Sequence, residues 1–139
     1  MSAKPFGLAV KAVIVDSEGR SLLLRRSSTN RHFVGQWEWP GGKVDPGEDF
    51  AAAVCRETAE ECGLDVEISG LVGATEFEMP QSIVVVLCME VQVTGGDLRL
   101  SNEHDAAEWV PLGELERWPL TEHVRPFMLD YAARRGAKQ

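Results

Sequence analysis

The sequence predicts a single α/β domain over residues 1–139, either of the α+β type or a three-layer α/β/α arrangement. Three observations support this fold class. The chain of 139 residues has room for one hydrophobic core. Its hydrophobic (44%) and charged (26%) fractions are those of a globular protein. Strand-like segments, a helix-like segment, further strand-like segments and a terminal helix-like segment follow one another, which is the order expected of such a domain.

The N-terminal third favours strands. Residues 8–15 (LAVKAVIV) are apolar and rich in β-branched side chains, and they end at a cluster of turn residues. The strand pattern resumes at residues 21–24, so we expect a hairpin. Residues 25–36 are polar and predict an exposed loop, and residues 37–39 (WEW) alternate like a short strand.

Residues 49–62 predict a helix. Three alanines favour it, and Gly63 follows where a C-terminal cap belongs. On a helical wheel, one face carries small and apolar side chains and would pack on a sheet. The opposite face gathers Glu57, Glu60 and Glu61 at i, i+3 and i+4.

The second half alternates strands with a final helix. Residues 66–77 predict one or two short strands, and residues 82–93 predict a long one. A short strand is expected at residues 108–110, and a second helix at residues 121–135. The longest apolar run has seven residues, whereas a bilayer span needs about 20, so no membrane association is expected.

Charge and cysteine content exclude several classes. The net charge of −8 argues against a protein that binds a nucleic acid polymer, which needs a basic surface. An acidic chain still binds a small polyphosphate when divalent cations bridge the two. Three cysteines without a CxxC pattern predict neither a disulfide framework nor a zinc site. With no export signal in the first ten residues, we expect a cytoplasmic protein.

The three helix glutamates have two interpretations. They form either a solvated acidic surface or a site for a hard cation such as Mg²⁺. Like charges at this spacing cost a few tenths of a kcal/mol per pair. They also lie late in the helix, where the macrodipole favours cations. A bound divalent cation would remove both conflicts.

The residues around this helix match a known motif. Gly42, five residues, Glu48, seven residues, and then residues 56–64 (RETAEECGL) resemble the Nudix box, GX5EX7REUXEEXGU, where U is a bulky aliphatic residue. The match departs at Thr58, which replaces an aliphatic residue on the sheet-facing side of the helix. Threonine has the shape of valine but carries a hydroxyl that needs a partner.

The resemblance implies the Nudix fold, an α/β/α sandwich with a mixed sheet. It implies hydrolysis of a nucleoside diphosphate linked to another moiety, with Mg²⁺ or alternatively Mn²⁺. Arg56 would orient Glu57, and Glu48 would join the same network. The metal ligands implied are Gly41 (through its carbonyl), Glu57, Glu60, Glu61 and Glu103.

Weaker similarity extends to the MutT-like branch, through residues 22–26, 36–43 and 103–110. That branch has a further acidic residue before a strand of the EWV type. Glu103 matches it best, and Glu108 is the second choice. Either Glu60 or Glu103 would take the proton of the attacking water. The catalytic residues implied are therefore Glu60, Glu103, Arg56 and Glu48.

The substrate remains open between several classes. The MutT resemblance favours a nucleoside triphosphate, including an oxidised one, cleaved to the monophosphate and pyrophosphate. The alternative is ADP-ribose or another nucleotide sugar. Pro80 lies 16 residues beyond the box, where the ADP-ribose branch has a proline, but a MutT-type chain also holds proline there, so this residue does not discriminate. Residues 119–122 lack the asparagine that reads oxidised guanine in the MutT-like branch. A non-catalytic nucleotide-binding Nudix module, as a monomer or homodimer, is the alternative of another class.

Several residues are expected to bind this small-molecule nucleotide. The arginines would hold phosphates, although they are equally explained as surface charges on a loop. The tryptophans would stack a base, although core packing is the commoner use of such side chains. The predicted substrate-binding residues are Arg25, Arg26, Trp37, Trp39 and Lys43, with Arg31 as a further phosphate contact.

Overall fold

The computed structural model describes residues 3–137 and contains two sheets. The larger one is mixed: β1 pairs in parallel with β6 and antiparallel with β4, and β5 pairs antiparallel with β6. Its strand order is β4-β1-β6-β5. Their bounds are β1 Phe6–Ile14, β4 Gly41–Lys43, β5 Leu64–Met79 and β6 Ser82–Gly96.

The smaller sheet is antiparallel, with order β3-β2-β7. It comprises β2 (Arg20–Arg26), β3 (Trp37–Glu38) and β7 (His104–Pro111). The hairpin expected from the first two strands is wrong. β1 and β2 belong to different sheets and meet at an isolated bridge between Val15 and Ser21. Both edges of β1 are taken by β4 and β6, partners that are distant in sequence.

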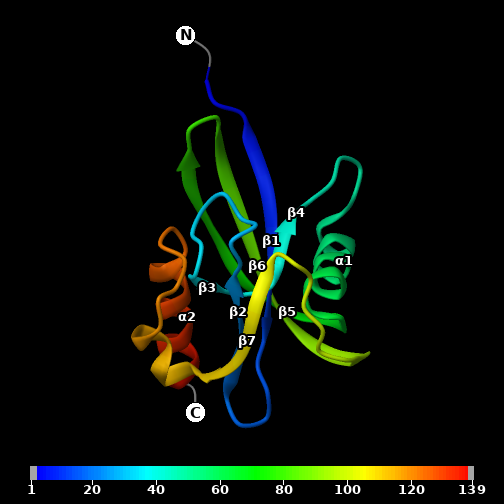
Figure 1. The fold of residues 1–139 in the computed structure, drawn as a ribbon, viewed down its shortest axis with the longest axis vertical. Helices are drawn as coiled ribbons and strands as arrows, with labels where there is room; N and C mark the ends of the chain where they lie inside the picture. The colour runs from blue at the N-terminus through cyan, green and yellow to red at the C-terminus, as the bar shows by residue number, and fades with distance from the viewer. Residues whose placement is uncertain (1–2, 138–139) are drawn as a thin grey trace.

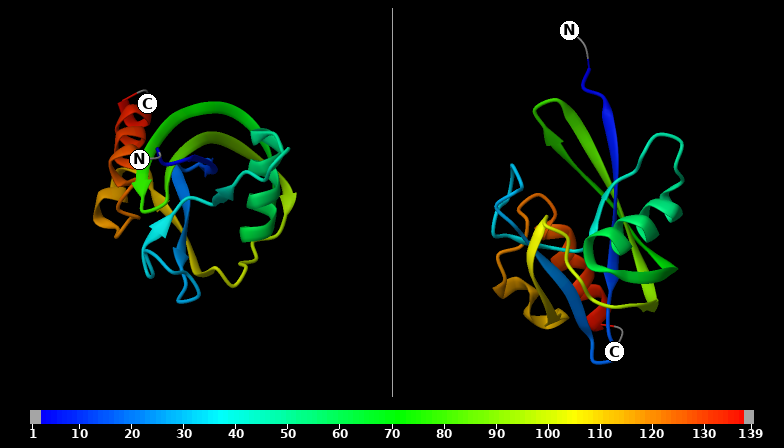
Figure 2. Two further views of the ribbon diagram at one scale, coloured as in Figure 1. Left: turned by 90° about the horizontal axis from the view of Figure 1, so that it is seen from above. Right: turned by 45° about the vertical axis from the view of Figure 1, so that its right-hand side comes forward.

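Helices cover the sheets on opposite sides (Figures 1 and 2). The helix α1 (Phe50–Cys62) packs on one side, and α2 (Arg125–Ala137) with the short 3-10 helix η1 (Leu112–Arg117) packs on the other. Alternate residues of β1 therefore enter two cores, Ala12 on the α1 side and Val13 on the α2 side. This arrangement confirms the predicted α/β/α sandwich with a mixed sheet.

The helix α1 begins and ends as the sequence predicts. The side chain of Asp49 accepts a hydrogen bond from Ala52 N (2.7 Å), and Gly63 adopts a left-handed conformation with φ of 75°. Thr58 is fully buried, and its hydroxyl donates to the carbonyl of Val54 at 2.7 Å. The hydroxyl is thus satisfied within the helix, which explains why the departure from the box is tolerated.

The elements β5, β7 and α2 depart most from their expected bounds. Instead of one or two short strands, β5 is a single strand of 16 residues whose register shifts three times, which breaks the alternation in the sequence. The strand β7 begins at His104, because its pairing with β2 continues past the apolar segment. The helix α2 begins at Arg125 rather than at Thr121, with Pro126 in its first turn. Within residues 3–137, each helix is too short or too polar to cross a bilayer.

Candidate active site

Arg56 ties the segment before α1 to the helix. Its Nε and Nη2 donate to the two carboxylate oxygens of Glu48 at 2.7 and 2.9 Å. Its Nη1 donates to Glu57 at 2.9 Å and to Glu60 at 3.2 Å, and its Nη2 also reaches the carbonyl of Lys43 at 3.1 Å. These bonds, with one from the N–H of Asp45, lower the pKa of Glu48 to about 2. The loop, the helix and β4 are therefore held by one guanidinium.

Glu57 and Glu61 are the more buried of the three helix glutamates. Burial raises the pKa of Glu57, and burial raises that of Glu61 to about 7. The Oε2 of Glu61 accepts a hydrogen bond from Gly41 N at 3.1 Å. A Cβ on Gly42 would lie 2.6 Å from Oε2 of Glu57. Glycine at position 42 therefore lets Glu57 lie directly against β4.

Glu103 faces these carboxylates across a cavity of about 330 Å³. Its backbone is fixed by the loop after β2, because its carbonyl accepts from Ser27 N at 2.9 Å and from Asn30 Nδ2 at 2.7 Å. Glu108, the alternative to Glu103, lies exposed on β7 opposite Leu23. The residues lining the cavity are Arg26, Asn30, Glu38, Gly41, Gly42, Lys43, Glu57, Glu61, Glu103 and His104.

The chemistry of these donors fits a hard divalent cation. Four carboxylates line the cavity, those of Glu38, Glu57, Glu61 and Glu103, and the burial that raises the pKa of Glu57 and of Glu61 is a cost that a cation would offset. In the present side-chain conformations, no three carboxylate, imidazole or thiol groups within residues 3–137 are close enough to hold one ion together. Oε1 of Glu57 accepts a hydrogen bond from Arg56, and Oε2 of Glu61 accepts one from Gly41 N, so one oxygen of each carboxylate is already bound within the protein.

A buried charge network that the sequence analysis missed lies beside this cavity. Glu38 accepts from Arg26 Nη1 at 2.9 Å, lies 2.8 Å from His104 Nε2, and forms an ion pair with Lys11 at 3.4 Å. Burial alone would raise the pKa of Glu38, but the charges of Lys11 and Arg26 and the hydrogen bond with His104 hold it at about 2. The pKa of Lys11 is raised overall: burial alone would lower it, but the carboxylates of Glu38 and Glu61 outweigh that effect.

The sequence did carry a signal for this network. Lys11 is the one charged residue in the apolar segment 8–15, and Glu38 stands between two tryptophans. Both side chains are buried, and buried charges are rare unless they are paired. A charged residue inside an apolar strand therefore indicates a partner from another element, although the sequence does not say which one.

Acid should weaken the fold through Glu38. Its folded pKa of about 2 lies below its ordinary value near 4.5, so it stabilises the native state above pH 4.5 and loses this contribution as the pH falls towards 2. The full effect is about 3 kcal/mol of unfolding free energy. We expect the stability difference between wild type and Glu38→Gln, from urea unfolding, to shrink between pH 5.5 and pH 2.5. A difference that stays constant over this range would contradict the assignment.

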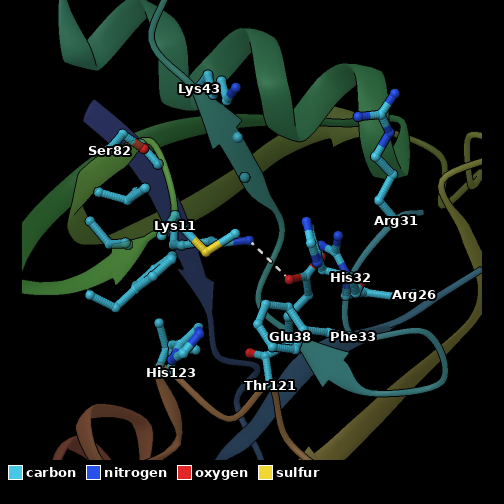
Figure 3. Close-up of a pocket in the computed structure, with 18 of the residues that line it drawn as sticks. Lys11, Arg26, Arg31, His32, Phe33, Glu38, Lys43, Ser82, Thr121 and His123 are labelled. Atoms are coloured by element: carbon cyan, nitrogen blue, oxygen red, sulfur yellow. Dashed lines mark hydrogen bonds and ion pairs between the residues drawn. The ribbon is translucent and has the colours of Figure 1, made fainter. Parts of the chain in front are cut away.

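A second, larger cavity of about 640 Å³ is shown in Figure 3, and the residues it shares with the first show that the two adjoin. The two share Arg26, Glu38, Gly41, Gly42 and Lys43, so β4 and the end of β2 form a common wall. The rest of the larger cavity is lined by β1, by residues 31–33 of the loop after β2, by β5 and β6 with the turn between them, and by the segment before α2. A ligand spanning both cavities would therefore place one end near the carboxylates.

Comparison with known proteins identifies the family. The NUDIX domain matches residues 5–131. The chain belongs to the Nudix family. It is 30% identical to the CTP pyrophosphohydrolase of Escherichia coli K12, over 94% of this chain and 96% of that protein. It is 31% identical to the ADP-ribose pyrophosphatase of Methanocaldococcus jannaschii, over 75% of this chain and 62% of that one.

A solved structure shows the same fold at full length. The MutT protein of Methanosarcina mazei Go1 superposes with a TM-score of 0.87 and 32% identity, over 100% of both chains. The MutT-like resemblance is thereby confirmed. Because its relatives are named as pyrophosphohydrolases and pyrophosphatases, the chain is a Nudix hydrolase, a class that generally uses divalent metal ions.

The residues predicted to bind substrate divide into two groups. Arg26 and Lys43 line both cavities of this Nudix domain, and Arg31 lines the larger one. Arg25 instead pairs with Asp105 at 2.7 Å and lies over the ring of Trp37, 5.7 Å from its centroid.

The two predicted base-stacking tryptophans lie in the core. Trp37 packs edge-on against Trp118 with centroids 4.8 Å apart, and it is 8% exposed. Trp39 is 2% exposed and donates from Nε1 to the hydroxyl of Ser21 at 2.9 Å. The packing interpretation therefore describes both rings, and we leave them and Arg25 out of the proposed substrate site.

Proposed function

We propose that this Nudix hydrolase cleaves a nucleoside triphosphate, including an oxidised one, to the nucleoside monophosphate and pyrophosphate, with Mg²⁺ as cofactor and Mn²⁺ as the alternative. The observation that carries the proposal is that Glu57, Glu61 and Glu103 line one cavity beside the Arg56 network. A divalent cation bound there would neutralise phosphate charge. A basic pair, Arg26 and Lys43, stands at the wall that leads to the larger cavity.

The metal would be held by side-chain and backbone oxygens that do not already accept a hydrogen bond within the protein. Glu57 and Glu61 each keep a second carboxylate oxygen, and the Gly41 carbonyl and Glu60 complete the proposed ligand set with Glu103. Arg56 holds Glu57 in place through one bond and Glu48 through two. A bidentate guanidinium fixes direction as well as distance, so Arg56 acts as a positioning residue.

Glu103 is the proposed acceptor of the proton from water. Attack of water on phosphorus breaks one phosphoanhydride bond, gives the monophosphate and pyrophosphate, and releases one proton. Glu103 lines the cavity and its carbonyl accepts two hydrogen bonds from the loop after β2, whereas Glu60 is not among the residues that line the cavity and is bonded to Arg56. A carboxylate that lines the cavity and is free of an arginine partner suits general-base catalysis better.

A second candidate substrate is ADP-ribose. Pro80 lines the larger cavity, and one relative is named an ADP-ribose pyrophosphatase. A triphosphate carries more charge than a diphosphate sugar, so the cavity-lining cations Arg31 and Lys43, which have no ion-pair partner among residues 3–137, favour the triphosphate. The two candidates predict different products from one assay.

The test is hydrolysis of dGTP, 8-oxo-dGTP, CTP and ADP-ribose in ¹⁸O-labelled water, with Mg²⁺ and with EDTA. We expect pyrophosphate and a labelled monophosphate or pyrophosphate from a triphosphate, and no turnover in EDTA. A kcat/KM for ADP-ribose tenfold or more above every triphosphate, about 1.4 kcal/mol of transition-state preference, would assign the second candidate. Turnover that persists in EDTA would contradict the metal site.

Mg²⁺ should also stabilise the folded protein. A cation that binds the native carboxylates but not the unfolded chain raises the free energy of unfolding by RT ln(1 + [Mg²⁺]/Kd), about 1.4 kcal/mol at tenfold the Kd. We expect a rise in Tm of a few degrees in millimolar Mg²⁺, measured by calorimetry. The rise should be lost in Glu57→Gln and retained in Glu67→Gln, an exposed glutamate on β5. An equal rise in both variants would contradict the site.

A further inference from the structure

Glu103, the proposed proton acceptor, is an exposed residue that is held by its backbone. Its carbonyl accepts hydrogen bonds from Ser27 N at 2.9 Å and from Asn30 Nδ2 at 2.7 Å. Glu57, in contrast, is held by its carboxylate, which accepts from Arg56. The position of Glu103 at the cavity therefore depends on what fixes the loop after β2 and the residue that follows Glu103 in the chain.

The guanidinium of Arg26 fixes the loop after β2. Its Nη2 donates to Oδ1 of Asn30 at 3.0 Å, so the Nδ2 end of the same amide is turned to the carbonyl of Glu103. Its Nε donates to the carbonyl of His32 at 3.0 Å, further along the same loop. One side chain thus holds the loop at two points, and one of them leads directly to Glu103.

The same guanidinium holds His104 through Glu38. Nη1 of Arg26 donates to Oε2 of Glu38 at 2.9 Å, and Nε2 of His104 donates to that same oxygen at 2.8 Å, since an ionised carboxylate only accepts. His104 is 4% exposed and Glu38 is 5% exposed, so water does not compete for these bonds. Figure 3 shows Arg26 and Glu38 together at the wall of the larger cavity. The dipeptide of Glu103 and His104 is therefore held at both residues from one arginine.

A β-bulge brings this arginine to His104. The register of β2 and β7 passes from Arg25 opposite Ala106 to Arg26 opposite His104, so Asp105 is the extra residue in β7. A bulge re-aims the side chains around it and is common beside active sites. The pairing of the two strands therefore places Arg26 directly across from the dipeptide that it holds.

We propose that Arg26 is a positioning residue for Glu103, as Arg56 is for Glu57. Three of its five N–H groups are already bonded within the protein, and its charge is paired with Glu38. This inference rests on the proposed function, since it assigns the arginine that holds the proposed proton acceptor. A residue that acts through the geometry of Glu103 should affect kcat more than KM, because it makes no contact of its own with the substrate.

The experiment is a double-mutant cycle between Arg26 and Glu103. Arg26→Lys keeps the charge, but an ammonium cannot bond the loop and Glu38 together. The assay uses whichever of dGTP, 8-oxo-dGTP and CTP the wild type hydrolyses fastest with Mg²⁺. We expect kcat to fall by about 10- to 100-fold, KM to change by less than about threefold, and the Kd of Mn²⁺ without nucleotide, measured by calorimetry, to rise by about tenfold.

The second half of the cycle repeats the change in a Glu103→Gln background. There the carboxylate that Arg26 positions is already gone, so Arg26→Lys should alter kcat and the Kd of Mn²⁺ by less than about threefold, because residues that act as one unit are not additive. Asn30→Ala removes only the link to the loop and should give the same pattern, which keeps the test open if Arg26→Lys does not fold.

Two further substitutions separate the contacts from the fold. His104→Gln keeps an N–H donor for Glu38 and should retain most of the activity, whereas His104→Leu removes the donor and should behave as Arg26→Lys does. Arg20→Lys makes the matched change at the other end of β2, in an ion pair with Asp16, and should leave kcat and the Kd of Mn²⁺ unchanged.

Each other outcome decides against the proposal or against the proposed function. The same fold-change in both backgrounds would overturn the positioning role of Arg26. A large rise in KM at constant kcat would place Arg26 on the substrate phosphates and overturn it as well. A wild type that hydrolyses no triphosphate would reject the proposed function, and the Mn²⁺ cycle would then decide the positioning role by itself. A wild type that binds no Mn²⁺ would overturn both.

Discussion

Glu60→Gln is expected to lower kcat/KM by about 10²- to 10³-fold with no loss of melting temperature. A metal ligand contributes several kcal/mol of charge stabilisation in the transition state, and each 1.4 kcal/mol is a factor of ten. The fold should not suffer, because the side chain is 59% exposed and its one hydrogen bond, to Arg56, is 3.2 Å long. Removing its charge also relieves repulsion with Glu57 on the same helix face.

The measurement compares steady-state kinetics across a Mg²⁺ titration with a calorimetric Tm. Glu116→Gln, at an exposed position of η1, is the matched control and should behave as wild type in both. Wild-type kinetics in Glu60→Gln, with an unchanged Mg²⁺ dependence, would remove Glu60 from the site. A large fall in Tm would instead mean that the activity loss reports folding.

The features that the sequence predicted best are local ones. The start of α1 at Asp49, its end at Gly63 and the spacing of its glutamates depend on contacts within a few residues, which local sequence determines. The Nudix box extends this to the site, because Arg56 reaches Glu48 across one loop. Pattern and spacing were therefore enough to predict that Arg56 links Glu48 to the glutamates of α1.

The features that were missed depend on pairing between distant segments. The predicted hairpin fails because β1 pairs with β6, some 75 residues later, and this pairing places β1 and β2 in different sheets. The network around Glu38 joins side chains from four strands, so no local pattern shows it. For the same reason the sequence left two uses open for the tryptophans of residues 37–39, since the rings they pack against, Trp118 and Tyr131, come from the C-terminal part of the chain.

Arg56→Lys is expected to lower kcat/KM by about 10- to 100-fold although the positive charge is kept. Replacing a residue that orients a metal ligand typically costs this much. A lysine ammonium is a point charge and cannot bridge both oxygens of Glu48 while also donating to Glu57. Arginine does both here, at 2.7, 2.9 and 2.9 Å. The variant should thus lose the geometry of the network and keep its net charge.

The carboxyl of Glu48 provides a readout that a general loss of stability would not mimic. Hydrogen bonds from Arg56 hold its pKa at about 2. In Arg56→Lys the pKa should rise towards its ordinary value near 4.5, which an NMR titration of the side-chain carboxyl measures. The pKa rises because the hydrogen bonds from Arg56 stabilise the charged carboxylate of Glu48, and the variant loses them. A fall in kcat/KM without this rise would mean that Arg56 acts elsewhere than through Glu48.

A matched control separates position from chemistry. Arg134→Lys makes the same substitution in an exposed ion pair with Asp130 on α2, where the distance is 2.9 Å, and it should leave both kcat/KM and Tm unchanged. Added guanidinium chloride at low millimolar concentration should partly restore turnover in Arg56→Ala, because the free cation can occupy the space between Glu48 and Glu57. An Arg56→Lys enzyme as active as wild type would show that charge alone suffices there, and that the bidentate geometry of the network has no part in catalysis.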